Sequence, residues 1–174
     1  MADKTRVLVL GGGFAGINAT ANLARALGRN QQVEIWLVSR HNYFLFIPML
    51  HEAATGAVEP RHVAQPVRRA FRGKGISFLK SEVQGIDLEG RRVQTDHGPM
   101  EYDYLVLGLG SDTNFFGLDA AKPHVFELKS LADARKLHYH ILEMFERAAT
   151  LDDPALRRAS LTFVVAGAGP TGVE

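Results

Sequence analysis

Two glycine patterns in the sequence have the spacing of a phosphate-binding turn, and the first lies near the N-terminus. Gly11-x-Gly13-x-x-Gly16 follows an apolar run and opens a helical stretch. In such a turn the first glycine allows the tight bend, the second lets the backbone approach a pyrophosphate, and the third lets the helix pack closely on the strand. The helix N-terminus then offers N–H groups to the anion. The pattern indicates a dinucleotide site, with a plain strand-to-helix turn as the alternative.

The same spacing recurs near the end of the sequence. Gly167-x-Gly169-x-x-Gly172 follows a second apolar run at residues 161–166, and Pro170 stands where the first residue of a helix is expected. Two copies in one chain are far less expected by chance than one. We therefore predict a strand at 161–166 and a second nucleotide-binding turn, of which the sequence includes only the beginning.

The first turn must be positioned by the elements around it. Residues 5–38 have the pattern of strand, helix and strand, and a crossover of this length implies that the two strands are parallel. A ribose-binding acid is expected at the end of the second strand, where Ser39 stands instead. A serine makes only one modest contact, so Arg40 or backbone groups would have to assist it. Glu34 is the only acid on this strand but lies at the wrong end, and we interpret it as solvated.

The middle of the chain changes from irregular to β patterning. Residues 41–60 have aromatic residues and prolines without periodicity and are predicted to be mostly irregular, while 65–72 is predicted to be a short helix with Pro66 in its first turn. Four strand-like runs follow, at residues 76–79, 83–88, 91–95 and 102–109, with turns predicted at 89–90 and 97–99. The pattern is typical of a meander that ends in a buried strand.

A long helix is predicted between the meander and the second glycine turn. Ser130 is followed three residues later by Asp133, the spacing of a capping box, and apolar residues then recur at helical intervals. The helix is predicted over 131–149, and Pro154 follows shortly after its end.

Composition excludes several classes of function. The formal net charge is +1 with no extended basic run, so nucleic acid is not expected as a partner. The chain has no cysteine, which excludes disulfides, thiolate zinc sites and a redox dithiol in this span and fits a cytoplasmic setting. The histidines lack paired metal-ligand spacing, so no metal is expected. No window approaches the roughly 18 apolar residues of a membrane span.

Five segments of the sequence together resemble type II NADH:quinone oxidoreductases, and they lie at residues 7–16, 42–50, 59–63, 102–111 and 167–174. The resemblance implies an α/β fold: a Rossmann-like FAD-binding domain with a parallel sheet, an inserted β-meander and the start of a second dinucleotide-binding fold. Residues 1–110 would form the FAD-binding domain, without its C-terminal elements. Residues 111–160 would form a connecting segment with the long helix, and 161–174 the first strand and glycine turn of an NADH-binding domain.

The family resemblance also implies a function. The first fold would hold FAD, the second NADH, and the flavin would pass electrons to a membrane quinone, with the full-length protein peripheral to the inner face of the membrane. The 174-residue chain itself is expected to be inactive and to self-associate through uncovered edges. A flavin-binding fragment without turnover and a ferredoxin- or rubredoxin-reductase-like parent remain alternatives. The lack of cysteine argues against disulfide reductases and sulfide:quinone oxidoreductases.

The resemblance assigns roles to residues around the flavin nucleotide. The positions expected to face the FAD pyrophosphate are Gly11, Gly13, Phe14, Ala15 and Gly16. The positions expected near the adenosine are Ser39, Arg40 and, through its backbone, Val83.

Further roles concern the flavin ring and the second nucleotide. The loop expected beside the isoalloxazine ring contains Phe46, Ile47 and Pro48, with Asn42 either a flavin ligand or a turn former. The second flavin signature of the family matches Gly108, Gly110 and Ser111. The NADH motif matches Gly167, Gly169 and Gly172, and the candidate catalytic acid near flavin and nicotinamide is Glu174.

Overall fold

The computed structural model of the chain describes residues 4–173, which form two compact units. The first unit combines Met1–Phe44 with Gln65–Asp112, and the second combines Leu45–Ala64 with Thr113–Glu174. Each unit is therefore built from two separate stretches of the chain.

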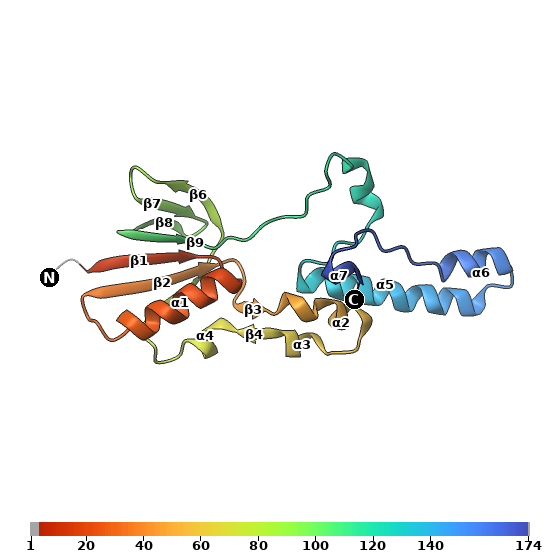
Figure 1. The fold of residues 1–174 in the computed structure, drawn as a ribbon, viewed down its shortest axis with the longest axis horizontal. Coiled ribbons are helices and arrows are strands. Elements are labelled where there is room, and N and C mark those ends of the chain that lie inside the picture. Colours follow the sequence, from red (N-terminus) through yellow and green to blue (C-terminus); the bar gives the residue numbers. More distant parts are fainter. Residues whose placement is uncertain (1–3, 174) are drawn as a thin grey trace. The chain divides into compact units, whose positions relative to one another are not determined.

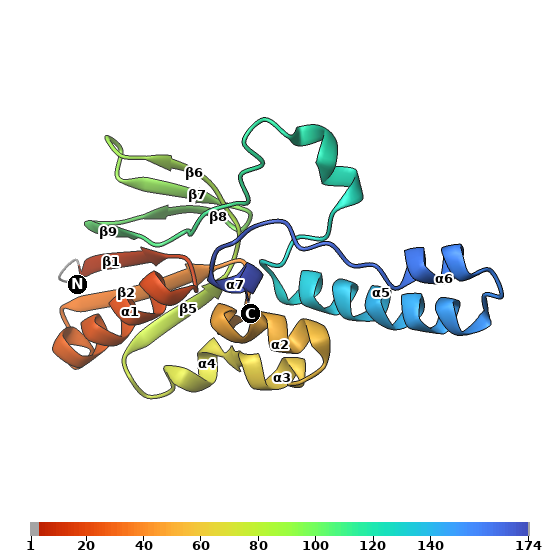
Figure 2. The ribbon, with the colours of Figure 1, turned by 45° about the vertical axis from the view of Figure 1, so that its right-hand side comes forward.

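The first unit contains a four-stranded parallel sheet in the order β5-β2-β1-β9 (Figures 1 and 2). Its strands are β1 (Thr5–Leu10), β2 (Val33–Ser39), β5 (Ile76–Lys80) and β9 (Tyr104–Leu107). Helix α1 (Phe14–Leu27) connects β1 to β2, and these two strands pair in parallel. The predicted strand–helix–strand unit and the predicted α/β class are thus confirmed.

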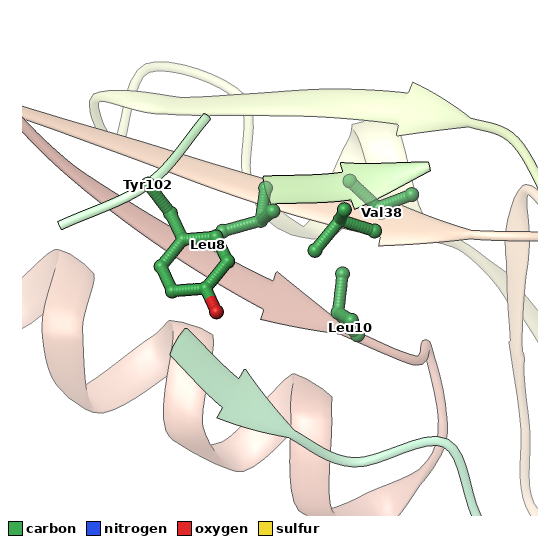
Figure 3. Packing of buried hydrophobic residues seen from close by; sticks show 5 residues of the cluster. Leu8, Leu10, Val38 and Tyr102 are labelled. Carbon is green, nitrogen blue, oxygen red and sulfur yellow. The ribbon is translucent and has the colours of Figure 1, made fainter. Parts of the chain in front are cut away.

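Side chains alternate between the two faces of this sheet, as strand geometry requires. Val9 and Leu37 face the layer made by α1 and α4 (Val67–Ala70). Leu8, Leu10 and Val38 face the opposite way, and Figure 3 shows them close to Tyr102. That second face is covered by an antiparallel meander of strands β6 (Val83–Asp87), β7 (Arg92–Thr95) and β8 (Gly98–Glu101).

The second unit is mainly helical. Its helices are η1 (Ile47–Met49), α2 (Leu50–Thr55), α3 (Pro60–Val63), η2 (Asp119–His124), α5 (Leu131–Thr150), α6 (Pro154–Ser160) and α7 (Pro170–Val173). Two short paired strands, β3 (Tyr43–Leu45) and β4 (Ala64–Pro66), contain the points at which the chain passes between the units. The core of the second unit forms where α2 packs on α5, around Leu50, Ala53, Ala54, Val63 and Ala134.

The long helix α5 begins as the sequence predicts. The Ser130 hydroxyl accepts the Asp133 N–H at 3.1 Å, and the Asp133 carboxylate accepts the Ser130 N–H at 2.7 Å. The two bonds complete a capping box, which satisfies N–H groups that a helix start otherwise leaves unpaired. The helix ends at Thr150, one residue beyond the prediction, and α6 folds back alongside it (Figures 1 and 2).

The prediction of a strand at 161–166 is wrong. Residues 162–168 have no regular secondary structure, and Val164 and Val165 are 87% and 71% exposed. A strand requires a neighbour to pair with its N–H and C=O groups. None of residues 4–173 pairs with this run, so its β-branched sequence alone does not make it a strand.

The predictions for 41–60 and 65–72 also need correction. The first segment is not mostly irregular, because α2 forms there and buries three side chains against α5, a partner about eighty residues away in sequence that local patterning could not reveal. The helix predicted over 65–72 shortens to α4. Pro66 is extended, with φ −61° and ψ 122°, and therefore precedes the helix instead of lying in its first turn.

The strands between residues 76 and 109 do not form one meander, as we had predicted. Residues 76–79 belong to the parallel sheet as β5, not to the meander. The turn predicted at 97–99 is shorter, because Gly98 and Pro99 already pair with β7 as part of β8. The final strand, β9, is not fully buried, since it lies at an edge of the sheet and leaves Tyr104 and Leu107 exposed.

Glu34 is not simply solvated, as we had interpreted it. The register of β1 and β2 places Arg6 opposite Glu34, and the guanidinium Nε lies 3.0 Å from the carboxylate. Burial by itself raises the pKa of Glu34, but the hydrogen bond and charge of Arg6 outweigh it and hold the pKa below the ordinary value. This acid therefore secures the start of the two strands, far from the glycine turn.

Candidate dinucleotide site

The turn between β1 and α1 requires glycine at two of its positions. Gly11 has φ +100°, a conformation that disfavours side chains, and its N–H donates to the Val38 carbonyl at 2.8 Å. A Cβ on Gly11 would lie 2.0 Å from the Gly108 carbonyl oxygen, and a Cβ on Gly16 would lie 1.7 Å from the Gly11 carbonyl oxygen. The backbone is thus packed too tightly for any side chain.

Gly13 differs because the space around it is open. A Cβ added there would meet nothing within 4 Å, and Phe14 and Ala15, which follow it, are exposed. Gly13 is the N-cap of α1, no side chain caps the helix, and its first turn has no acidic residue. A 14-residue helix with such an open N-terminus favours an anion, so the residues present fit a pyrophosphate.

The end of β9 lies directly against the turn. The Gly108 N–H donates to the Leu10 carbonyl at 2.8 Å, and a Cβ on Gly108 would lie 3.0 Å from the Gly16 nitrogen. Gly110 and Ser111 follow on exposed backbone, with Gly110 at φ +82°. The structure therefore joins Gly108 to the first glycine turn, although the two are about ninety residues apart in sequence.

Ser39, at the end of β2, is buried beside the same turn. It is 8% exposed, and its Oγ lies 2.6 Å from where a Cβ on Gly12 would be placed. Its carbonyl accepts the Ser81 N–H at 3.0 Å, which ties the ends of β2 and β5 together. Arg40 is exposed at the same edge. In open parallel sheets ligands bind outside the carboxyl ends of the strands, which is where these residues lie.

Charged side chains of both signs lie near His41, which follows β2. Burial, reinforced by the charges of Arg40 and Lys80, lowers the pKa of His41, while Glu82 acts in the opposite direction. Arg40 and Lys80 are thus the cations that act on His41, opposed by Glu82.

Sequence reasoning missed a cluster centred on Asp96, in the turn between β7 and β8. Asp96 Oδ1 accepts hydrogen bonds from the Ser81 hydroxyl and, at 2.9 Å, from the Glu82 N–H, and it lies 3.0 Å from His97 Nδ1. Three hydrogen bonds lower the pKa of Asp96 to about 2. The bond from Ser81 has the largest effect, followed by those from Glu82 and His97. The sequence signal was slight: Ser81 and Glu82 come just after a predicted strand.

Not all of the predicted adenosine and ring residues lie in the first unit. Val83 begins β6, where it pairs with Thr95, and the Asn42 carbonyl accepts the Val67 N–H at 3.0 Å. The three residues expected beside the flavin ring belong to the second unit and are exposed there: Phe46, Ile47 and Pro48.

The second glycine turn repeats the backbone geometry of the first. Gly167 has φ +121°, and a Cβ on Gly172 would lie 2.1 Å from the Gly167 carbonyl oxygen. Gly169, like Gly13, has nothing within 4 Å of an added Cβ, and Pro170 begins α7 as predicted. The candidate catalytic residue Glu174 lies outside the described residues.

Residues 4–173 lack two further features. No helix in this range is both long and apolar enough to cross a membrane. Within the same range, no group of three His, Cys, Asp or Glu side chains is placed to hold a metal ion.

A parallel sheet with a tight glycine turn at the carboxyl end of its first strand is the arrangement of a dinucleotide-binding fold. The chain belongs to the pyridine nucleotide-disulphide oxidoreductase family, whose model matches residues 5–174. Both glycine turns lie within the matched range.

Within that family, the chain is similar to the Type II NADH:quinone oxidoreductase of Staphylococcus aureus (strain NCTC 8325 / PS 47). The two are 33% identical over 172 residues, which cover 99% of this chain and 42% of that protein. The resemblance inferred from the five sequence segments is therefore confirmed. The chain spans less than half the length of the curated relatives it matches.

Two solved structures have a similar fold. The structure of NDH2 from Plasmodium falciparum in complex with RYL-552 is matched with a TM-score of 0.76 at 23% identity, over 86% of this chain and 31% of that one. The sulfide:quinone oxidoreductase from Aquifex aeolicus is matched with a TM-score of 0.71 at 28% identity, over 82% of this chain and 32% of that one. Because its identity is 23%, the Plasmodium falciparum structure supports the fold alone.

Proposed function

We propose that the first unit binds FAD and that the chain is the FAD-binding, N-terminal part of an NADH:quinone oxidoreductase. The observation that carries the proposal is the turn from Gly11 to Gly16, in which two glycines admit no side chain while Gly13 faces open space. Relatives named Type II NADH:quinone oxidoreductase, similar along 99% of this chain, support the choice of activity.

The residues of the first unit would each hold a part of the nucleotide. The N-terminus of α1 would bind the pyrophosphate through backbone N–H groups at Gly13 to Gly16. Ser39 and Arg40 would contact the adenosine ribose, and the Val83 backbone the adenine. Gly108, Gly110 and Ser111, which match the second flavin signature, would contact the FAD where the chain leaves the sheet after β9.

The residues proposed for the flavin ring belong mainly to the second unit. Phe46, Ile47 and Pro48 would flank the isoalloxazine ring, with Asn42 before them. When bound, FAD would supply the redox chemistry, accepting a hydride from NADH and delivering electrons to a quinone. NADH would use Gly167, Gly169 and Gly172, with Glu174 near the nicotinamide.

The proposed domain organisation follows from these roles. Residues 1–110 would be the FAD-binding domain, 111–160 a connecting segment, and 161–174 the beginning of the NADH-binding domain. The division at 110 is supported by Gly110, whose φ of +82° turns the chain just before the first unit ends at Asp112.

Chemistry based on a redox cysteine is disfavoured in this span. Disulfide reduction and sulfide oxidation both use a reactive thiolate, and the 174 residues include no cysteine. Quinone reduction by a flavin needs no protein thiol, so the composition agrees with the proposed activity.

A second candidate is that the chain binds flavin without turnover. It is favoured by the run before the second turn, which pairs with no strand among the described residues and leaves Val164 and Val165 exposed. A nucleotide turn without its sheet offers NADH little surface.

One experiment separates the two candidates. The purified chain is loaded with FAD under anaerobic conditions, and its visible flavin absorbance is followed on addition of NADH and then dithionite. Bleaching by NADH shows that the 174-residue chain itself oxidises NADH, whereas bleaching by dithionite alone shows that this chain binds flavin without turnover. A chain that retains no flavin contradicts both.

We propose in addition that the chain self-associates in solution and that the parent protein acts at the cytoplasmic membrane surface, where a quinone is available. Self-association is supported by apolar residues that are more than half exposed, including Leu107 at the edge strand β9 and Phe116 in the second unit. Light scattering tests self-association, and a sharp monomeric mass would exclude it.

Flotation of the protein with liposomes tests the proposed contact with the membrane.

A further inference from the structure

Asp96 lies in the turn between β7 and β8, where its Oδ1 lies 3.0 Å from His97 Nδ1, but its other hydrogen bonds go to a different connection. Its carboxylate accepts the Ser81 hydroxyl and, at 2.9 Å, the Glu82 N–H, while its own N–H donates to the Glu82 carbonyl at 3.2 Å. The backbone between β5 and β6 is thus attached to this turn through both a donor and an acceptor.

The same connection is attached to the nucleotide edge of the sheet. The Ser81 N–H donates to the Ser39 carbonyl at 3.0 Å, and the Ser39 side chain fills the space beside Gly12. A continuous series of contacts therefore runs from the glycine turn through Ser39 and Ser81 to Asp96. Val83, two residues beyond Ser81, begins β6 and pairs with Thr95, the residue before Asp96.

We propose that Asp96 is a positioning residue for the adenine end of the dinucleotide. It holds the backbone of residues 81–83 beside the carboxyl end of β2. The backbone groups of this segment then face the adenosine. The inference rests on the proposed FAD function of the first unit. It adds a residue of the meander to the site, acting through other residues and not through the ligand.

The turn itself does not need Asp96 for closure. The Thr95 hydroxyl donates to the Gly98 carbonyl at 2.7 Å and accepts the His97 N–H at 3.2 Å, which already closes the turn. The opposite turn of the meander shows the usual arrangement, because the Asp87 carboxylate accepts the Gly90 N–H at 2.8 Å within its own turn. The Asp87 carboxylate therefore bonds within its own turn, whereas the Asp96 carboxylate connects the meander to the edge where the nucleotide is proposed to bind.

The test compares two ligands on the 174-residue chain by isothermal titration calorimetry. ADP carries the adenosine, and inorganic pyrophosphate engages the glycine turn alone. Asp96→Ala is expected to weaken ADP binding about tenfold, because it removes charge-assisted hydrogen bonds that order the segment, and to leave pyrophosphate affinity unchanged. Asp96→Asn, which keeps one acceptor oxygen, should give an intermediate loss.

The matched control is Asp87→Ala, which removes an equivalent carboxylate from the other turn. It is expected to lower thermal stability without changing either affinity. Should Asp96→Ala fail to fold, Asp96→Asn and Ser81→Ala decide the matter, each with a selective loss for ADP. Unchanged ADP binding, or equal losses for ADP and pyrophosphate, would overturn the inference.

Failure of the inference is distinct from failure of the proposed function. If the unsubstituted chain binds neither FAD nor ADP, the proposed function and the inference fail together. If it binds both ligands but the Asp96 variants bind ADP normally, only the positioning role is lost.

Discussion

The two glycine turns share two backbone features but have very different surroundings. In both, the first glycine has a positive φ, +100° at Gly11 and +121° at Gly167, and the last glycine excludes a Cβ. The first turn follows β1, which pairs with β2 and β9, whereas the run before the second is unpaired among the described residues. Local sequence is thus sufficient for the turn, and tertiary partners are required for the strand.

The largest difference is expected from alanine at the last glycine of each turn. Gly16→Ala places a Cβ 1.7 Å from the Gly11 carbonyl oxygen in a packed sheet, so we expect a loss of more than about 3 kcal/mol and of FAD binding. Gly172→Ala should leave FAD binding intact. Fluorescence of Trp36, the single tryptophan, reports on the first unit, and equal effects of the two changes would contradict the comparison.

The residues before each turn should also differ in their contribution to stability. Leu8 is fully buried in β1, and Leu8→Ala is expected to cost about 3 kcal/mol by cavity formation. Val164 is 87% exposed, so its side chain makes few contacts that a substitution could remove. Val164→Ala should therefore change the unfolding free energy by less than about 0.5 kcal/mol. Urea unfolding of both variants measures this, and a large cost at Val164 would show that the run is packed.

The central glycines test binding separately from stability. Gly13→Ala adds a methyl group to open space, so stability should stay within about 0.5 kcal/mol of the parent chain. The methyl would occupy space needed by the pyrophosphate, and we expect FAD affinity to fall about tenfold. Gly169→Ala is the matched control and should bind FAD normally. An unchanged affinity in Gly13→Ala would place the ligand elsewhere.

The smallest expected effect is on the pH dependence of stability in the first unit. The pKa of Asp96 lies at about 2, below the ordinary value of 3.8, because of its hydrogen bonds to Ser81, Glu82 and His97. A depressed pKa means that this carboxylate stabilises the fold above about pH 4 and loses that contribution as the pH falls toward 2. Unfolding followed by Trp36 fluorescence should therefore show a pH slope in this window that is reduced in Asp96→Asn. An identical slope would show that Asp96 is not paired in solution.

Much of the first unit was predictable because its signals are local. The residues from Thr5 to Ser39 have both the apolar runs and the glycines of a strand–turn–helix–strand unit. The capping box at Ser130 was equally readable, since it depends on two residues three apart. Helix α2 was not, because its burial depends on α5, far away in sequence.

The candidate site divides in the same way. Gly11, Gly13 and Gly16 were identified from spacing, and their geometry agrees with the reasons for which they were chosen. Asp96 was missed because a single acid in a turn has no characteristic pattern. Only the packing of the meander on the parallel sheet brings it to Ser81, and that juxtaposition is a property of the fold.

The most direct test of the account is the stoichiometry of FAD binding to three forms of the chain: unsubstituted, Gly16→Ala and Gly172→Ala. Equilibrium dialysis with free FAD gives the amount bound by each. We predict one FAD per chain for the unsubstituted form and for Gly172→Ala, and none for Gly16→Ala. FAD retained by Gly16→Ala, or lost from Gly172→Ala, would contradict the claim that the first glycine turn, and not the second, binds the flavin nucleotide.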